Sequence, residues 1–409
     1  MAHQPIVVPA ESATSPARWG VLALLFSSIA INLLDRQVLS VLAPVIRDEL
    51  QLSNQQYSYI VVSFMLGMTL FQVPAGALLD RWGARRGLPV LMLWWSVANA
   101  LHATARGVWH FCAFRFLLGA GECGNYSGGI KVISQWFPPR ERALAGGVFN
   151  SGTVIGAFVA PAIIVGIAAQ FGWRWAFVLP SALGLLWIAP WLMLYRDRAP
   201  QAAAAAPIKG ILRRRQVWGA MLMRMLGGPV VHFYWYWLPE YLKRERSFSM
   251  EMIGAYAGIP FLFAGLGNVA GGWFSGRLMR GGWTADRARK TSFLLSAILC
   301  ASSLAVPLVP GELAAVAVIC AATFGISAYT ATHIGALTDL FPQRALARIA
   351  GITGAGEGVM NIVLTLATGV VVDRFSYVPV FAAAGLMPLV GVAALFGLIR
   401  KVEPVAFER

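Results

Sequence analysis

The sequence predicts an all-α integral membrane protein with twelve transmembrane helices in two pseudo-symmetric six-helix bundles. Hydrophobic residues make up 58% of the chain and charged residues only 12%, whereas about one quarter of a soluble protein is charged. Apolar runs long enough to cross a bilayer recur along the 409 residues. The two halves of the sequence also resemble each other at a nearly constant offset. Together these features predict a duplicated bundle of membrane-spanning helices.

Each expected span is an apolar run bounded by charged or turn-forming residues. Because a helix rises 1.5 Å per residue, about 20 residues are enough to cross the hydrocarbon core. The twelve spans are expected at residues 18–43, 54–79, 88–105, 109–133, 143–169, 174–195, 216–242, 251–278, 288–308, 312–335, 346–371 and 377–400.

The longest polar connection divides the chain into two similar parts. It reads YRDRAPQAAAAAPIKGILRRR from Tyr195 to Arg215, and its Pro, Ala and Arg content is typical of a linker. We therefore expect five segments: a cytoplasmic tail (1–17), an N-terminal six-helix bundle (18–195), a cytoplasmic linker (196–215), a C-terminal six-helix bundle (216–400) and a second cytoplasmic tail (401–409).

The Lys and Arg residues that give the net charge of +15 are concentrated in alternate loops of the chain. Of the 33 Lys and Arg residues, 22 lie in alternate loops and at the two ends, and seven lie in the opposite loops. This is the positive-inside pattern, and it predicts that both termini are cytoplasmic. The same pattern argues against nucleic-acid binding. The first 17 residues are polar and show no cleavable signal peptide, so the first helix is expected to act as an uncleaved insertion signal.

Internal duplication is visible in the residues. A shift of 204 places WFPPRERALAGGVFNSG, from Trp136, on LFPQRALARIAGITGAG, from Leu340, and aligns Arg140 with Arg344. A shift of 196 places Arg81 on Arg277. Duplicated helical bundles are a known transporter architecture, with the substrate site between the halves near the middle of the membrane.

Enzymatic and metal-dependent functions find no support in the sequence. No His-Glu-x-x-His, Gly-x-Ser-x-Gly or clustered His/Asp set is present. The four cysteines, Cys112, Cys123, Cys300 and Cys320, lie in apolar runs without metal-ligand spacing and are expected to be small buried hydrophobes. We expect no enzyme activity, no cofactor and no metal. A sensor is also disfavoured, because the longest linker is too short for an output domain.

Two acid–base pairs interrupt the apolar runs. Arg115 and Glu122 lie seven residues apart in FCAFRFLLGAGECGNYSGGI, and Asp35-Arg36 interrupts the first span. Seven residues are about two helical turns, so Arg115 and Glu122 should share one face, roughly 10 Å apart. Ionised groups inside a membrane are costly and usually face a bundle interior or a water-filled cavity. These four residues therefore indicate a pathway for a charged solute and a proton, although a structural ion-pair network is the alternative.

The segment GALLDRWGARRG, Gly76 to Gly87, joins the second and third spans. Its glycines permit a tight turn, and Asp80 can pair with a cytoplasmic arginine in one state and release it in another. The pattern resembles the signature loop of the major facilitator superfamily. The residues that carry this expected gating role are Gly76, Asp80, Arg81, Gly83, Arg85 and Arg86.

Within that superfamily the chain resembles the anion:cation symporters of the hexuronate and galactonate group. The resemblance rests on Asn32 to Arg36, RFLLGAGECGNYSGGIK from Arg115, QWFPPRERALAGGVFNSG from Gln135, FGWRWAF from Phe171 and RMLGGPVVHFYWYWLPEYL from Arg224. It implies that Asp35 and Glu122 carry coupling protons and that Arg36 holds the substrate carboxylate. Arg115 is placed to bias the two acids.

Physical chemistry points to the same roles. Burial favours the protonated form of a carboxyl group, and a nearby arginine favours the ionised form. An anion that arrives at Arg36 weakens that arginine's hold on an acid, so substrate and proton binding become linked. Arginine suits this role because its planar guanidinium binds a carboxylate through two parallel hydrogen bonds.

The expected pocket departs from the family pattern. Leu33 and Met68 stand where the family has tyrosines, and Thr153 stands where it has a glutamine. A less hydroxylated substrate therefore competes with a sugar acid, since unpaired hydroxyls in an apolar pocket are costly. The further candidate substrate-binding residues are Asn32, Asn125, Tyr126, Asn150, Ser151, Thr153 and Tyr234.

Glu357 is unexpected in the eleventh span. It is a candidate second proton site, or a ligand for a cationic part of the substrate, although a neutral or paired acid is equally open. His232 and His333 are expected to be structural.

The sequence thus predicts a proton-coupled symporter of a small organic anion, a carboxylate such as a hexuronate or aldonate, working by rocker-switch alternating access. Import of a less hydroxylated monocarboxylate or an aromatic acid is the alternative, and a proton-driven exporter is a third hypothesis. The expected location is the bacterial inner membrane. The expected partners are the organic anion, the proton and the lipid bilayer, without nucleic acid, and the expected functional unit is a monomer.

Overall fold

The computed structural model describes residues 17–137, 142–197, 211–341 and 343–405, and within these the side chains of Val73, Asp80, Ser134, 142–144 and 343–348 are not described. Most of the two expected tails and residues 198–210 of the expected linker lie outside the described residues. Arg140, one of the aligned arginines, does so too.

Helices account for nearly all of the described chain. The N-terminal bundle contains α1 (Ala17–Val41), α2 (Ala43–Leu50), α3 (Asn54–Leu101), η2 (His102–Thr104), α4 (Val108–Trp136), α5 (Arg142–Phe171) and α6 (Trp175–Leu194). After η3 (Ile211–Arg213), the C-terminal bundle contains α7 (Arg215–Arg246), α8 (Met250–Tyr256), α9 (Ile259–Arg280), α10 (Ala285–Cys300), η4 (Ala301–Ala305), α11 (Glu312–Leu340), α12 (Gln343–Arg374), α13 (Val378–Ala394) and η5 (Leu395–Ile399).

The expected spans lie on these helices, although those at 288–308 and 377–400 end in the short helices η4 and η5. Two further differences in the described residues are larger. The spans at 54–79 and 88–105 form one continuous element, α3, in which Gly83 alone has non-helical dihedral angles. The span at 251–278 is broken at residues 257–258 into α8 and α9. Within the described part of the chain, seven helices are long and apolar enough to cross a membrane. The helix α4 is not among them, because Arg115, Glu122 and Lys131 lower its hydropathy.

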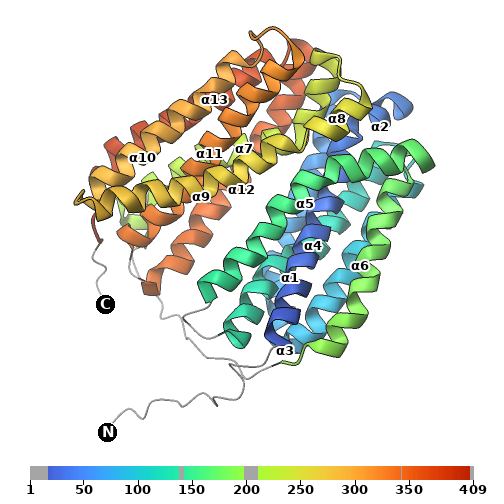
Figure 1. The fold of residues 1–409 in the computed structure, drawn as a ribbon, viewed down its shortest axis with the longest axis horizontal. Coiled ribbons are helices and arrows are strands. Elements are labelled where there is room, and N and C mark those ends of the chain that lie inside the picture. Colours follow the sequence, from blue (N-terminus) through green and yellow to red (C-terminus); the bar gives the residue numbers. More distant parts are fainter. Residues whose placement is uncertain (1–16, 138–141, 198–210, 342, 406–409) are drawn as a thin grey trace.

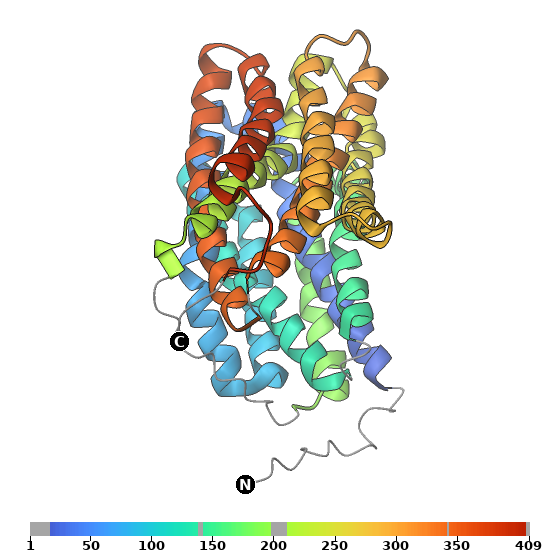
Figure 2. The same cartoon turned by 90° about the vertical axis from the view of Figure 1, so that its left-hand side faces the viewer.

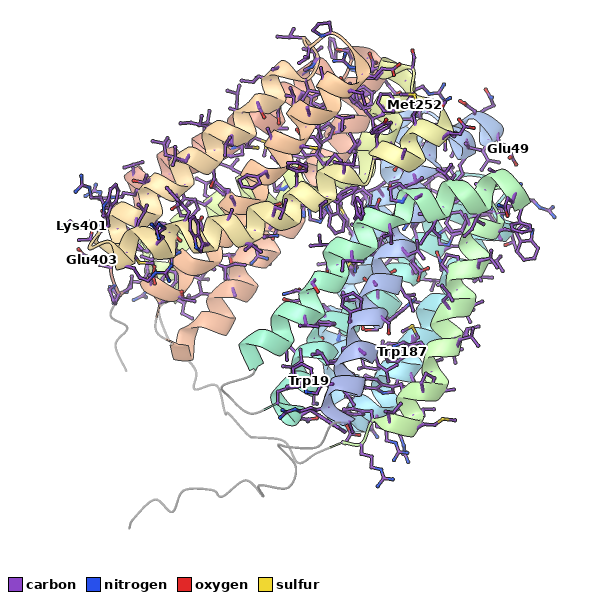
Figure 3. All side chains as sticks on the ribbon, viewed as in Figure 1. Trp19, Glu49, Trp187, Met252, Lys401 and Glu403 are labelled. Carbon is purple, nitrogen blue, oxygen red and sulfur yellow. The ribbon has the colours of Figure 1, made fainter. Side chains whose placement is uncertain are left out.

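The two bundles meet at one end and diverge toward the other (Figure 1). In the view turned by 90°, the C-terminal helices lie above those of the N-terminal bundle (Figure 2). Glu49 and Met252 lie near the end where the bundles meet, and Trp19 and Lys401 lie near the opposite end (Figure 3). We call these the closed end and the open end. Because α1 and α7 both start at the open end, positions along either helix measure depth between the two ends.

Polar contacts join the two bundles at the closed end. Arg47 of α2 pairs with Glu240 of α7, and Arg244 of α7 pairs with Asp48. Asp373, near the end of α12, accepts hydrogen bonds from the backbone N–H groups of Asn54 (3.1 Å) and Gln55 (2.8 Å). A carboxylate at this position satisfies the free N–H groups at the start of α3 and complements the helix dipole.

Apolar packing reinforces the closed end. One continuous hydrophobic cluster includes Leu42 and Ile60 from the N-terminal bundle and Trp237 and Leu242 from α7. The rings of Tyr57 and Trp237 are 5.1 Å apart in an edge-to-face contact, and the Tyr57 hydroxyl donates to the backbone oxygen of Tyr236 (2.7 Å). The two halves are therefore held together through both apolar and polar contacts at this end.

Candidate functional site

The crossing of α3 and α4 positions the charged residues of the N-terminal bundle. Gly67 of α3 and Gly119 of α4 face each other, since a Cβ at Gly67 would lie 2.1 Å from the Phe116 oxygen and one at Gly119 would lie 2.2 Å from the Phe64 oxygen. Small residues allow helices in membranes to approach this closely. The crossing places the Phe64 ring 5.2 Å from the guanidinium carbon of Arg36 and 5.7 Å from that of Arg115.

Arg36 and Glu122 form the central ion pair. The Arg36 Nε donates to Glu122 Oε2 at 2.6 Å, joining α1 to α4. The Glu122 side chain is fully buried, whereas the Arg36 side chain is 19% exposed. In the described part of the chain, the Nη atoms of Arg36 have no hydrogen-bond partner, and neither does Glu122 Oε1. The outer edge of the guanidinium is thus available to an anion.

Asp35 and Arg115 lie beside this pair and make different contacts. Asp35 is fully buried, and its Oδ1 accepts from the Nδ2 of Asn99 in α3 at 2.7 Å. Arg115 is also buried and donates from Nη2 to the backbone oxygen of Arg36 at 3.3 Å. Arg115 makes no described ion pair with a carboxylate, although it interacts electrostatically with Asp35 and Glu122. The four residues expected to act together are therefore brought together.

Two buried amides flank the central pair. Asn32 lies one turn before Arg36 on α1, and Asn125 lies one turn after Glu122 on α4. Among the described residues, the Nδ2 of Asn125 lacks a hydrogen-bond partner, and Ser28 donates to Asn125 Oδ1 at 3.1 Å. The Asn32 side chain interacts with the Glu122 carboxylate. Buried polar groups are normally hydrogen-bonded. The free donor of Asn125 fits a hydroxylated ligand.

No described hydrogen bond or ion pair joins the remaining candidates to the central pair. Tyr126 is exposed and packs on Phe149, and Asn150 is also exposed. Ser151 donates to the backbone oxygen of Val148 (2.7 Å), and Thr153 is partly buried on α5. Tyr234 is buried inside the C-terminal bundle, where its hydroxyl bonds Ser303 of η4 at 2.6 Å. The structure does not bring Tyr234 to the Arg36–Glu122 pair.

Glu357 has a partner in its own bundle. Arg224 of α7 donates from Nε to Glu357 Oε2 of α12 at 2.5 Å. His333 bonds the backbone oxygen of Ala220 through Nε2 (2.9 Å), and His232 contacts the backbone oxygen of Gly228 through Nδ1 (3.1 Å). Both histidines are thus hydrogen-bonded to helix backbone. Arg224 already supplies a cation to Glu357 from within the chain.

The signature segment is a helical break, not an extended loop. Gly83 has φ 72°, a conformation that glycine adopts without steric cost. Asp197, after α6, accepts from the backbone N–H groups of Ala84 (2.9 Å) and Arg85 (3.2 Å) and so caps the second part of α3. The Arg85 side chain donates to the Leu192 oxygen (3.2 Å). The side chains of Arg81 and Arg86 make no described polar contact, and Gly76 lies within α3. The pairing expected of Asp80 lies outside the described side chains.

Several contacts around the site were not predicted from the sequence. Asn99 binds Asp35 from 64 residues away, and Asp197 reaches Ala84 from 113 residues away, so no local pattern marks either contact. Arg224 carried a usable signal, because it is a charged residue inside an apolar span. Its partner lies 133 residues further along the chain and could not be inferred.

Two helical bundles with ionised groups held between their helices form the architecture of a secondary transporter. Residues 25–281 match the family described as Major Facilitator Superfamily. The chain belongs to this superfamily, whose members are transporters and not enzymes. It is a multi-pass membrane protein.

Two relatives of the chain are hexuronate transporters. The chain is 28% identical over 407 residues to the hexuronate transporter of Escherichia coli (strain K12), with 94% of each chain covered. It is 30% identical over 405 residues to the hexuronate transporter of Bacillus subtilis (strain 168), again covering 94% of each. The chain is therefore related to sugar-acid transporters of the superfamily.

A solved structure supports the fold. A bacterial homologue of the human lysosomal transporter Spinster, in an inward-facing and occupied conformation, superposes with a TM-score of 0.82 at 19% identity and covers 95% of this chain and 98% of its own. This similarity confirms the predicted fold class, the all-α major facilitator fold.

Proposed function

We propose that the protein is a proton-coupled symporter of a small organic anion, with a sugar acid such as a hexuronate or aldonate as substrate. The observation that carries the proposal is the Arg36–Glu122 pair. Its arginine is bound to the acid through Nε only, and the Nη edge is free among the described residues. A substrate carboxylate can bind that edge through two parallel, charge-assisted hydrogen bonds. Arg36 would therefore hold the substrate, as the family resemblance implies.

Charge balance supplies the reason for proton coupling. Asp35, Arg36, Arg115 and Glu122 sum to zero when all are ionised, and three of them are completely or almost completely buried. A substrate carboxylate adds one negative charge, and an uncompensated charge in such surroundings is costly. Protonation of Glu122 or Asp35 restores neutrality. Substrate and proton therefore favour each other's binding, and this linkage is reciprocal.

The amides of Asn32 and Asn125 beside the pair, with the Asn125 Nδ2 free among the described residues, favour a hydroxylated substrate. They offer hydrogen-bonding groups where Leu33 and Met68 offer none. The E. coli and B. subtilis relatives are hexuronate transporters, which supports the same class of substrate. The apolar side chains of Leu33 and Met68 favour the alternative, a less hydroxylated or aromatic carboxylate.

With cytoplasmic termini, as the charge pattern predicts, the open end faces the cytoplasm and the structure is inward-facing. Rocker-switch transport would then require the closed-end contacts of Arg47, Asp48 and Asp373 to separate. In this scheme the protein resides in the bacterial inner membrane, and the helix break at Gly83, with the arginines that follow it, lies on the cytoplasmic side.

Uptake into proteoliposomes tests the proposal. An inward proton gradient should drive accumulation of labelled D-galacturonate or D-galactonate above equilibrium, and Arg36→Gln should abolish it. Arg277→Gln, which removes an arginine that contacts Trp273 away from the pair, is the matched control and should retain uptake. Uptake of neither sugar acid, with strong uptake of benzoate, would replace the sugar acid by the aromatic alternative. Uptake that ignores the proton gradient would contradict symport.

A further inference from the structure

Asn99 of α3 links three helices of the N-terminal bundle through one amide group. The side chain is fully buried, and its Nδ2 donates to Asp35 Oδ1 of α1 at 2.7 Å. The same Nδ2 lies 3.2 Å from the backbone oxygen of Phe177 and 3.2 Å from Ser181 Oγ, both in α6. An amide nitrogen carries two hydrogens. One of them therefore bonds Asp35, and the two groups of α6 share the other.

The contacts with α6 fix the orientation of the amide. A rotation of the amide by 180° would exchange the positions of Nδ2 and Oδ1. The backbone oxygen of Phe177 can only accept a hydrogen bond, and Ser181 already donates its hydroxyl hydrogen to that oxygen (2.7 Å). Both groups of α6 therefore require a donor on this side of the amide. This requirement keeps Nδ2, not Oδ1, directed at Asp35.

A second donor group interacts with Asp35 from the same helix. Trp95 lies one turn before Asn99 on α3, is buried, and its side chain interacts with the Asp35 carboxyl group. The indole N–H can only donate. Two donors suit an ionised carboxylate, which accepts hydrogen bonds and cannot donate them. The contacts from α3 therefore favour the ionised form of Asp35, whereas burial favours the protonated form.

The amide of Asn99 also offers the acceptor that a protonated carboxyl group needs. Its Oδ1 is buried and has no hydrogen-bond partner among the described residues. A buried acceptor without a partner is costly, and a protonated carboxyl group has one O–H to donate. Because Oδ1 and Nδ2 belong to one planar group, a carboxylic acid can bond both atoms at once. It accepts from Nδ2 with one oxygen and donates to Oδ1 with the other.

We propose that Asn99 is a positioning residue for proton coupling, which holds the Asp35 carboxyl group in place in both of its protonation states. The ionised group accepts from Asn99 Nδ2. When Asp35 takes up a proton, its hydroxyl donates to Asn99 Oδ1 while its other oxygen continues to accept from Nδ2. Asn99 itself neither binds nor releases a proton. The inference rests on the proposed function, in which Asp35 is one of the two acids that a proton can neutralise.

The charged groups around Asp35 belong to α1 and α4. Glu122 of α4 disfavours a second negative charge at Asp35, whereas Arg115 of α4 and the adjacent Arg36 favour it. The helices α5 and α6 also pack against α1, and neither has an ionisable side chain between its ends. From α7, Tyr236 interacts with the two arginines and Glu122. Asn99 therefore acts on Asp35 through hydrogen bonds and adds no charge to this cluster.

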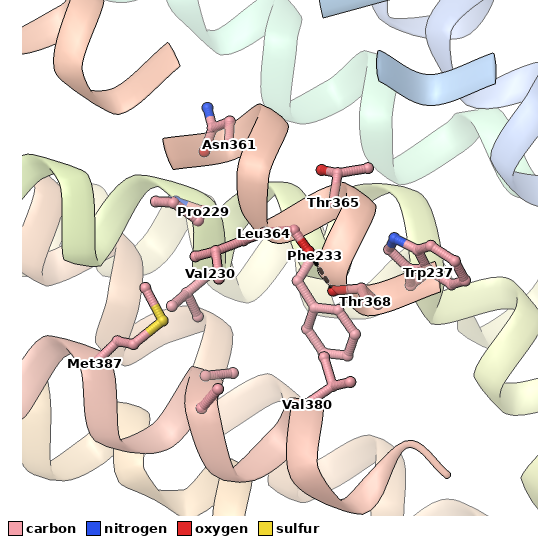
Figure 4. A pocket seen from close by; sticks show the side chains of 12 residues that line it. Pro229, Val230, Phe233, Trp237, Asn361, Leu364, Thr365, Thr368, Val380 and Met387 are labelled. Atoms are coloured by element: carbon pink, nitrogen blue, oxygen red, sulfur yellow. Dashed lines mark hydrogen bonds between the residues drawn. The ribbon is translucent and has the colours of Figure 1, made fainter. Parts of the chain in front are cut away.

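A second buried amide, Asn361 of α12, provides a matched comparison. It lines a small cavity beside Trp237 in the C-terminal bundle (Figure 4). Its side chain is 6% exposed, and its Oδ1 also lacks a partner in the described part of the chain. The nearest acid along its helix, Glu357, is paired with Arg224. The same substitution at the two positions therefore separates the loss of a buried amide from the loss of the contact with Asp35.

Infrared titration of the purified full-length protein tests the proposal. The C=O band of protonated Asp35 is identified by its absence in Asp35→Asn. Asn99→Leu removes a charge-assisted bond to the ionised acid but only a neutral bond to the protonated acid, so the band should persist to a pH about one unit higher. Asn361→Leu should leave the titration unchanged. The proposal is overturned by an unshifted band in Asn99→Leu, or by the lack of an Asp35 band wherever the protein is folded.

Asn99→Asp keeps the proposal testable if Asn99→Leu does not fold. It retains the size of the side chain and the acceptor but replaces the donor by a second carboxyl group. Two adjacent carboxyl groups do not readily ionise together, so the pair should keep one proton to a higher pH than Asp35 does in the unaltered protein. A protonated band that is lost at the same pH as in the unaltered protein, or at a lower pH, would contradict the role of the donor.

Uptake measurements separate this inference from the proposed function. In proteoliposomes, the pH at which D-galacturonate uptake is half-maximal should also be higher in Asn99→Leu than in Asn361→Leu. Proton-driven uptake in the unaltered protein with the same pH profile in both variants would overturn the role of Asn99 and leave the proposed function standing. A shifted Asp35 band together with uptake that ignores the proton gradient would overturn the proposed function alone.

Discussion

In each bundle an arginine is joined to a glutamate of another helix by the same bond, Nε to Oε2: Arg36–Glu122 at 2.6 Å in the N-terminal bundle and Arg224–Glu357 at 2.5 Å in the C-terminal bundle. Their surroundings differ. Glu122 is fully buried beside Asp35 and Arg115, whereas Glu357 is partly exposed beside Gly228. Burial makes the charge state of Glu122 sensitive to any added charge, which suits proton coupling. Exposure makes the Arg224 pair easier to exchange.

The two pairs are not related by the internal duplication. A shift of 204 residues carries Glu122 of the N-terminal pair to Ile326, which is buried in α11. The same shift relates Glu357 to Thr153. The N-terminal pair joins α1 to α4, and the C-terminal pair joins α7 to α12. The halves thus share a fold while their charged groups have separate placements.

The largest expected difference between the pairs concerns transport. Arg36→Gln should lower kcat/KM for sugar-acid uptake by roughly a hundredfold or more, since two charge-assisted hydrogen bonds of about 1.5–3 kcal/mol each are lost. Arg224→Gln should lower it by less than about tenfold, because a partly exposed ion pair contributes little. Initial uptake rates in proteoliposomes measure both. Equal losses in the two variants would contradict the division of roles.

A second difference concerns how each pair is positioned. Gly67→Ala places a Cβ 2.1 Å from a backbone oxygen, which cannot move independently, and should lower the free energy of unfolding by about 1–3 kcal/mol. Gly228→Ala meets only the Glu357 side chain, which can rotate away, so its effect should be smaller. Gly358→Ala, with open space around the glycine, is the control. Thermal unfolding in detergent should rank the variants in this order.

The contacts at the closed end determine from which side of the membrane the two arginine–glutamate pairs are accessible. Asp373→Asn removes a charge from the start of α3 and should cost about 1 kcal/mol, which shifts the equilibrium toward opening at that end roughly fivefold. Ser58→Cys, in a background without the native cysteines, reports the opening, because Ser58 Oγ lies beside Gly369 of α12. Its alkylation rate by an impermeant maleimide should rise accordingly. Asp286→Asn, at the open end, should leave the rate unchanged.

The smallest expected effect lies in the pH dependence of stability. The Trp173 indole, which donates to Glu49 at 2.6 Å, and Arg174 hold the pKa of this carboxyl below its usual value of 4.5. A lowered folded-state pKa contributes stability above the unfolded pKa, and that contribution is lost as pH falls through the folded pKa. Glu49→Gln should therefore show a smaller drop in unfolding temperature below pH 4.5 than the unaltered protein. The exposed Glu403→Gln should show the same drop as the unaltered protein.

Apolar periodicity and the charge pattern predicted the helical fold, because membrane spans follow from local composition. The residues of the N-terminal pair were also predictable, since Arg36 and Glu122 stand out as ionised groups in apolar spans. Their direct bond was not, because it joins helices 86 residues apart in the chain. The partner of Glu357 depends on the packing of α7 against α12, which no local pattern encodes. Tyr234 was expected near the substrate but turns into the bundle toward Ser303.

In the proposed function, Glu122 carries the coupling proton. Glu122→Gln cannot exchange a proton but keeps the size of the side chain. Proteoliposomes containing this variant should lose proton-driven accumulation of D-galacturonate while retaining counterflow exchange of labelled for unlabelled substrate. Glu357→Gln should retain both activities. Proton-driven accumulation that survives in Glu122→Gln would contradict the account.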